Sequence, residues 1–439
     1  MFPWREVFQL ILESFPFFFG RADLLLVASV VLLLVYMQYR RTAAIEQSLF
    51  GVSLSDPLAN TLTALGVGFL GGWIATFLFV LLGISLTDAG IGYLWLLAIT
   101  LMLVHPRFVC FAYGGGLLSL SHLLFGWPAV NVPAIMALVG VLHLVESLLI
   151  LVHGYRHPTP VYVRRGDGRV VGGFTMQKFW PMPFIALIAM LASRQAVTGP
   201  LLEMPDWWPL IKPGEPAAGD AIYIYMLFPV IAALGYGDIA VTTDPRRKAR
   251  RTSGMLLGYS VALMALALAG SARQGVPSAT LLGVPVVVFQ WLAALFSPLG
   301  HELVIYLSRR MEEQGEPLYD AAKGAVVLGV VPGTPAARMG LQPGDIIRSI
   351  GGFPVYDRTD VQEVLTPWAV DVEFVVENMH TGQRRTVRCP GKIPPLGVIF
   401  APSPGDPGFL SLDNRAGYGV MLRRLSRRIA RLLAGRTAR

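Results

Sequence analysis

The sequence is poor in charged residues and in cysteine, and each shortage excludes a class of protein. Charged residues occupy 15% of the 439 positions, whereas a soluble globular domain carries about a quarter. The two cysteines, Cys110 and Cys389, lie far apart, so the sequence predicts neither a disulfide framework nor a cysteine-based metal site. The net charge of +8 does not indicate nucleic-acid binding, because Lys and Arg cluster in short loops beside apolar runs and in the tail.

What the chain has instead is apolar sequence, at 54% of its residues and in runs near the length of a bilayer crossing. This pattern predicts a helical multi-pass membrane protein. The predicted crossings lie near 22–39, 61–84, 91–105, 108–126, 131–153, 181–196, 221–241, 254–272 and 279–299. Two of these are short, so the pattern is compatible with seven to ten helices. Residues 1–20 mix charged residues with Phe and Leu and are expected to lie in the interface or to insert halfway.

Basic residues follow alternate crossings, which predicts the orientation of the chain. They follow the first, fifth, seventh and ninth crossings, and these loops share one side if the crossings simply alternate. On the opposite side, the loop 194–220 holds four acidic residues against two basic ones. The positive-inside rule then places residues 300–439 in the cytoplasm and the protein in the plasma membrane.

After residue 322 the pattern becomes that of a small, mostly β domain. The stretch "VVPGTPAARMGLQPGDIIRSIGG" combines a strand, a short helix, a Pro-Gly-Asp turn and a second strand. It resembles a bacterial PDZ domain, and the resemblance covers residues 323–402. Gly340 is expected to end the first helix in a left-handed conformation. The second helix is predicted over 360–366, with Thr359 or Asp360 as its N-cap.

The PDZ resemblance implies that an extended chain end binds by strand addition, with backbone N–H groups holding its carboxylate. The apolar-Gly-apolar stretch 396–398 is interpreted as the carboxylate cradle, residues 399–400 as the docking strand and the second helix as the pocket wall. The predicted peptide-binding residues are Leu396, Gly397, Val398, Ile399, Phe400, Val361, Val364 and Leu365. Two alternatives stay open: 396–400 is an ordinary last strand and 316–320 forms the loop, or the domain is purely structural.

His301 and Glu302 begin a segment that resembles the His-Glu-x-x-His motif of zinc proteases. The position of the second ligand holds Ile305, and no Gly-x-Ser-x-Gly nucleophile segment occurs in the chain. The pair is therefore predicted to lie at the membrane exit, after the last crossing, and to brace the linker to the PDZ domain. The sequence predicts no enzyme, no cofactor and no metal site.

Three polar residues interrupt the fifth apolar run. Glu146 follows His143 by three positions, and His153 follows Glu146 by seven, which places the three residues on one face of a helix. A charged Glu146 would be costly there, so it must face the bundle and find a partner. Interhelical hydrogen bonding is favoured for a lone acid, and an ion path or a metal site is the alternative. Asp238 is predicted to cap a helix end or to pair with the arginines of 246–251.

The tail, residues 418–436, alternates an apolar stripe with arginines and predicts a basic amphipathic helix. Its predicted membrane-surface residues are Arg423, Arg424, Arg427, Arg428 and Arg431. We expect them to contact anionic lipid of the inner leaflet, and a solvated helix or one docked on a partner is the alternative.

The predicted domains are an N-terminal segment (1–20), a membrane bundle of about nine helices (21–300), a linker (301–322), the PDZ-like domain (323–402) and the tail (403–439). With "GYGDIAVTTDPRRKAR" and "HLVESLLI", this layout resembles the MinJ-like group of Gram-positive cell-division membrane proteins. The resemblance implies a membrane adaptor for division-site placement or envelope organisation. Its implied partners are a peptide or protein C-terminus and polar scaffold or division proteins, with no nucleic acid. The alternatives are a PDZ-regulated protease-like protein and a transporter that depends on Glu146.

Overall fold

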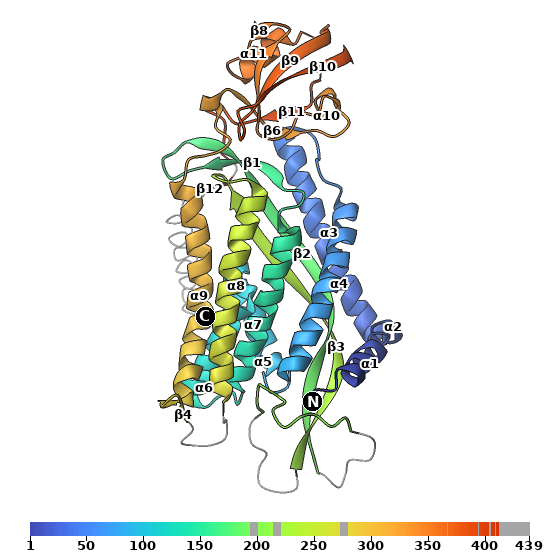
Figure 1. Ribbon diagram of the computed structural model, residues 1–439, viewed down its shortest axis with the longest axis vertical. Helices are drawn as coiled ribbons and strands as arrows, with labels where there is room; N and C mark the ends of the chain where they lie inside the picture. The colour runs from blue at the N-terminus through green and yellow to red at the C-terminus, as the bar shows by residue number, and fades with distance from the viewer. Residues whose placement is uncertain are drawn as a thin grey trace, which may run out of the picture.

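The computed structural model describes residues 1–193, 201–213, 221–272, 280–366, 368–393, 395–403, 405–408 and 410–411 (Figure 1). The helices are α1 (Trp4–Ser14), α2 (Phe17–Gly20), α3 (Ala22–Phe50), α4 (Pro57–Leu82), α5 (Ile91–Val104), α6 (Phe111–Phe125), α7 (Val132–Leu149), α8 (Pro245–Ser271), α9 (Val286–Gln314), α10 (Pro335–Arg338) and α11 (Arg358–Val364). Short helical turns are η1 (Pro106–Val109), the π-helical η2 (Ile150–Gly154) and η4 (Ala321–Lys323).

The strands are β1 (Thr159–Arg164), β2 (Val170–Ser193), β3 (Ala221–Ala240), β4 (Thr280–Leu281), β5 (Val284–Pro285), β6 (Ala325–Val330), β7 (Asp345–Ile350), β8 (Phe353–Pro354), β9 (Val370–Asn378), β10 (Arg384–Lys392), β11 (Val398–Phe400) and β12 (Leu410–Ser411). They form a four-stranded sheet, β12-β1-β2-β3, and a second sheet in the order β10-β9-β7-β6-β11.

Within the described part of the chain, five helices are long and apolar enough to cross a membrane: α3, α4, α7 with η2, α8 and α9. The starts of α4 and α8 follow from capping, since the Asp56 and Asp244 carboxylates accept backbone N–H bonds at the first turns. Many of their large apolar side chains face outward, including Leu26, Leu33 and Leu70. An exposed apolar surface of this extent indicates contact with lipid or with another protein.

α5 and α6 are too short to cross a bilayer. With 14 and 15 residues they are about 21 and 22 Å long, against a hydrocarbon core of about 30 Å. They meet at η1, and both lie in the half of the helical region remote from the C-terminal domain (Figure 1). The predicted crossings at 91–105 and 108–126 are therefore better described as one pair of short helices that turns back at η1.

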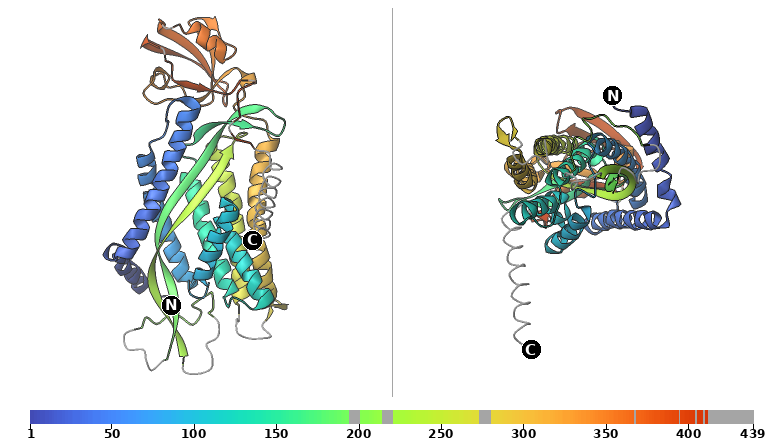
Figure 2. Two further views of the ribbon diagram at one scale, coloured as in Figure 1. Left: turned by 180° about the vertical axis from the view of Figure 1, so that it is seen from behind. Right: turned by 90° about the horizontal axis from the view of Figure 1, so that it is seen from below.

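The helices predicted over 181–196 and 221–241 are wrong, because residues 181–193 and 221–240 lie in the long antiparallel strands β2 and β3. Figure 2 shows this hairpin running along the length of the helical region. Three prolines favour strands over helices here, since proline inside a helix removes a hydrogen bond and clashes with the preceding turn. They are Pro181 and Pro183 in β2 and Pro229 in β3.

The outer edge of β2 keeps few unpaired donors, although it lies among apolar helices. Ile185 N–H points away from β3 and donates to Thr76 Oγ1 of α4 at 2.9 Å. The N–H groups along a strand point alternately to its two sides, so residues 181 and 183 face the same outer side as residue 185. Both positions are proline and therefore have no N–H that needs an acceptor. Ala189 N–H donates to Ser85 Oγ at 3.0 Å. Prolines and the hydroxyls of Thr76 and Ser85 thus leave few unpaired donors on an edge that lies among apolar segments.

The C-terminal domain has the predicted small β fold with two short helices. Gly340 has φ +71° after α10, as predicted, and β9 pairs with β10 in antiparallel orientation. α11 begins earlier than predicted and its N-cap is Asp357, not Thr359 or Asp360. Asp360 is instead the third helical residue, and its carboxylate accepts the Asp357 N–H to close a capping box.

This domain packs directly on the end of the helical region. Gly172 N–H of β2 donates to Tyr319 O at 2.8 Å, and Leu318 N–H donates to Val241 O at 2.9 Å. Leu328 and Ile399 of the domain belong to the same buried apolar cluster as the helices. β1 and the first part of β2 pair as an antiparallel hairpin, and this hairpin forms the platform on which the domain lies (Figure 1).

Candidate functional site

The predicted peptide-binding groove begins at residues 396–398, in the loop that leads into β11. Leu396 O accepts from Ala336 N–H at 3.0 Å, and Gly397 O accepts from Val331 N–H at 2.9 Å. In a trans peptide unit the N–H points opposite to the C=O, so the N–H groups of Gly397 and Val398 point away from the domain body. Gly397 has φ +79°, and a Cβ at this position would overlap Thr334. Two adjacent outward donors can bind a carboxylate.

The apolar wall of the groove comes from α11. Val361 is buried in the domain core, and Val364 and Leu365 are half-buried against that core. Leu396, Val398 and Phe400 pack on the same core. Ile399 points the other way, toward Pro160 and the helical region, because side chains alternate along a strand. Six of the eight predicted residues therefore pack on one core, and Ile399 faces the helical region. Their role in peptide binding stays a prediction.

The alternative loop, 316–320, is engaged elsewhere. The backbone of Leu318 and Tyr319 bonds to Val241 and to Gly172 of the long strands. Tyr319 is buried against Phe174. This segment joins the two regions and does not present free donors to the groove.

Tyr162 of β1 reaches the free edge of β11. Gly397 O and Ala401 N–H bond to the β6 side, so alternation directs the backbone of Val398 and Phe400 away from β6. The Tyr162 hydroxyl donates to Phe400 O at 3.2 Å. Burial raises the pKa of Tyr162, so the hydroxyl keeps its proton and remains a donor. A residue of the helical region thus occupies a carbonyl that an added strand would need.

A second group of polar residues lies inside the helical region. His143 and Glu146 line a hollow of about 910 Å³ together with Cys110, His301 and Asp238. Cys110 Sγ lies 3.2 Å from His143 Nε2 and 3.8 Å from His301 Nε2. No local spacing in the sequence relates these three residues, because they come from three different elements.

His153 does not share this hollow with the other two residues of its run. The π-helical turn η2 widens the helix from Ile150 onward, and this changes the direction of the side chains that follow. His153 Nδ1 accepts instead from Trp180 Nε1–H at 3.1 Å. The predicted common face therefore holds for His143 and Glu146 only.

His301 was predicted to follow the last helix. It lies instead near the middle of α9, which continues through Pro298 to Gln314. Glu302 accepts from Arg107 Nη2 at 2.6 Å and from the Tyr113 hydroxyl at 2.6 Å. The pair holds α9 against η1 and α6. A glutamate in these contacts is not positioned as the water-activating base of a zinc protease.

Asp238 neither caps a helix nor pairs with the neighbouring arginines, because it lies on β3. Its carboxylate lies 3.3 Å from Lys248 Nζ and accepts from Thr252 Oγ1 at 2.6 Å. Lys248 Nζ also lies 3.5 Å from Glu312 Oε1. This buried group joins β3, α8 and α9. The predicted tail helix and its arginines, 418–436, lie outside the described residues.

Comparison with known proteins assigns the C-terminal domain. A family model described as a PDZ domain matches residues 326–376. The cell division topological determinant MinJ of Bacillus subtilis is 23% identical over 279 residues, which are 62% of this chain and 62% of that protein. The putative serine protease HhoB of Synechocystis is 54% identical over 43 residues, 10% of each chain. Serine protease HTRA1 of Xenopus tropicalis is 34% identical over 68 residues, 16% of this chain and 15% of that one.

The two protease matches are too short to contain a protease domain, and they are of the length of a single small module. The similarity to MinJ extends well beyond a module of that size, although the chain covers less than two thirds of MinJ. Residues 326–376 are a PDZ domain, and the chain that carries them, with helices able to cross a membrane, is similar to a cell-division topological determinant.

Proposed function

We propose that this protein is a non-enzymatic membrane adaptor whose PDZ groove binds the C-terminus of a peptide or partner protein. The observation that carries the proposal is the pair of outward N–H groups at Gly397 and Val398, placed beside an apolar wall from α11. A carboxylate on this pair leaves the preceding residues free to add to β11. The similarity to MinJ supports a role in division-site placement or envelope organisation.

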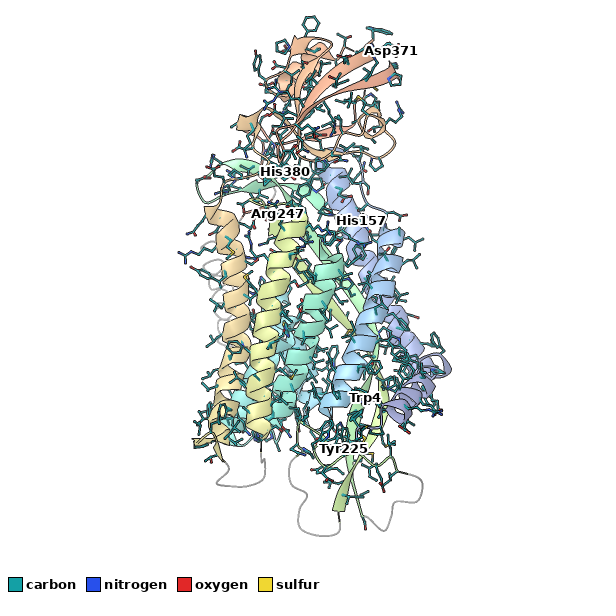
Figure 3. The ribbon with its side chains drawn as sticks, viewed as in Figure 1. Trp4, His157, Tyr225, Arg247, Asp371 and His380 are labelled. Atoms are coloured by element: carbon teal, nitrogen blue, oxygen red, sulfur yellow. The ribbon has the colours of Figure 1, made fainter. Side chains whose placement is uncertain are left out.

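The distribution of charge supports a multi-pass chain with the PDZ domain in the cytoplasm. Arg247 and His157 lie at the end of the helical region next to the PDZ domain, and Trp4 and Tyr225 lie at the opposite end (Figure 3). The basic residues at 246–251 and 309–310 belong to the ends of α8 and α9 on the PDZ side, and those at 40–41 lie in the second half of α3. The positive-inside rule assigns such an end to the cytoplasm. Lipid contact by the tail arginines remains a prediction.

Substitution of the groove wall tests the proposal. We expect Val364→Lys to weaken binding of C-terminal peptides at least about tenfold, about 1.4 kcal/mol, because it places a charge in the apolar pocket. The measurement is fluorescence anisotropy with the full chain in nanodiscs and a library of labelled peptides. Val370→Lys is the matched control, since Val370 is 55% exposed on β9. If no peptide with a free carboxylate binds, or if Val364→Lys binds peptides as tightly as Val370→Lys, the proposed peptide-binding groove is contradicted.

Tyr162 should compete with the bound peptide. A strand added to β11 must donate to Phe400 O, which already accepts from the Tyr162 hydroxyl. Removing one hydrogen bond of about 1 kcal/mol predicts that Tyr162→Phe binds peptides about fivefold more tightly in the same assay. Tyr356→Phe, on the exposed surface of the PDZ domain, should change nothing. Unchanged or weaker binding by Tyr162→Phe would mean that the peptide does not use this carbonyl.

A further inference from the structure

Cys110, His143 and His301 meet in the middle of the helical region. Cys110 precedes α6 at the tip of the short pair, and His143 and His301 lie near the midpoints of α7 and α9. Their ligand atoms all lie within 4.8 Å of one another. His143 is 3% exposed, and all three side chains line the same hollow.

The separations fit a transition metal ion bound at the centre. In a tetrahedral zinc site with ordinary bond lengths, neighbouring sulfur and nitrogen ligand atoms lie about 3.5 Å apart. The two sulfur–nitrogen distances here are 3.2 and 3.8 Å. Small changes of rotamer would therefore bring both nitrogens and the sulfur to bonding distance of one ion.

The hydrogen bonds of the two imidazoles direct lone pairs toward the cysteine. His143 Nδ1 lies 2.8 Å from Val139 O, which can only accept, so Nδ1 carries the proton and Nε2 has a lone pair. His301 Nδ1 lies 3.3 Å from the Tyr113 hydroxyl, whose own proton is donated to Glu302. His301 Nδ1 is then the donor, and its Nε2 also has a lone pair.

Two imidazole lone pairs thus point at one thiol, which has a single proton to share. A thiol hydrogen bond can satisfy one nitrogen and leaves the other lone pair directed at sulfur. A cation satisfies all three atoms at once, with Cys110 bound as the thiolate. The Val139 carbonyl and the chain Tyr113–Glu302–Arg107 are the outer contacts that hold metal-binding histidines in position.

We propose that Cys110, His143 and His301 bind one zinc ion that fastens α6, α7 and α9 together. Thiolate and imidazole ligands favour zinc over magnesium or calcium, which take oxygen ligands. Binding converts the Cys110 thiol to a zinc-bound thiolate and releases its proton to solvent. The ion and one thiolate leave a net charge of +1, which the Glu146 carboxylate on the same hollow can balance. This site replaces the sequence-based expectation that the chain binds no metal, and it does not depend on the PDZ groove.

The first test uses the wild-type chain, so it does not depend on whether a variant folds. The protein is purified in detergent, stripped with a chelator and titrated with Co²⁺. We expect one equivalent to bind, with the absorption of a thiolate–cobalt bond and of four-coordinate cobalt, and Zn²⁺ to displace it. Bound Zn²⁺ should also protect Cys110 from alkylation. Absence of the cobalt absorption together with unchanged alkylation of Cys110 would overturn the proposal.

Variants then assign the ligands. Cys110→Ser should abolish the thiolate–cobalt absorption, and His143→Ala or His301→Ala should weaken Co²⁺ binding at least tenfold. Cys389→Ser is the matched control, because Cys389 is buried in the PDZ domain, and it should keep the absorption. Loss of the absorption in Cys389→Ser with retention in Cys110→Ser would place the metal elsewhere and overturn the assignment. Elution as a single species in size exclusion shows that each variant is folded.

Discussion

Replacing Gly72 of α4 by alanine should abolish folding of the helical region. α4 lies so close to β2 that a Cβ at Gly72 would overlap the carbonyl oxygen of Pro183, and one at Gly68 would overlap that of Pro181. The clash is with backbone and cannot be relieved by a change of rotamer. We expect a loss above about 4 kcal/mol, which is in the range of severe overpacking. The measurement is the yield of monodisperse protein in detergent and its thermal unfolding temperature.

Gly66→Ala is the matched control for this experiment. Gly66 lies in the same helix, and a Cβ there meets nothing within 4 Å. Since alanine favours a helix over glycine by about 1 kcal/mol, this variant should be as stable as the wild type or slightly more stable. The comparison also tests the long hairpin itself. If Gly72→Ala unfolds at the wild-type temperature, α4 does not pack on a strand at Pro183, and the helix predicted over 181–196 becomes the better description.

The long hairpin shows which part of the fold the sequence could not specify. A continuous apolar run carries no alternation, so length and hydrophobicity alone predicted helices for β2 and β3. The signal that was present is the repeated proline in "WPMPF", which removes N–H donors at alternate positions. The strand edge at these prolines is covered by α4, which is about a hundred residues earlier in the chain. The local sequence therefore could not show that the edge is covered.

The PDZ domain was predictable for the opposite reason. Its turns depend on residues adjacent in sequence, such as Gly340 after α10, and local chemistry specifies them. The cluster around Cys110 depends on contacts between residues 33 and 191 positions apart. His301 was placed outside the helices because the last predicted crossing ended at residue 299, whereas α9 continues to Gln314.

Replacing the buried Lys248 should cause the second large loss of stability. Lys248 is fully buried, and its Nζ lies 3.3 Å from Asp238 and 3.5 Å from Glu312, while donating to Ser308 Oγ at 2.7 Å. Lys248→Met keeps the length of the side chain and leaves the Asp238 carboxylate buried without a cation. We expect a loss of about 3–5 kcal/mol, the usual cost of removing one partner of a buried pair. Thermal unfolding in nanodiscs measures it, and Arg247→Met, whose side chain is 79% exposed, should have little effect.

A double variant separates loss of charge pairing from loss of packing. Glu312 retains Arg251 at 3.9 Å and the N–H groups of Val241 and Thr242, so Asp238 is the carboxylate most affected by Lys248→Met. Lys248→Met with Asp238→Asn removes that unpaired charge, and the amide oxygen can still accept from Thr252. We therefore expect the double variant to recover most of the lost stability, because an uncharged replacement of a buried pair is often close to neutral. If the double variant is as unstable as the single one, Lys248 contributes through packing and its bonds to Ser308, and the charge of Asp238 is not what it compensates.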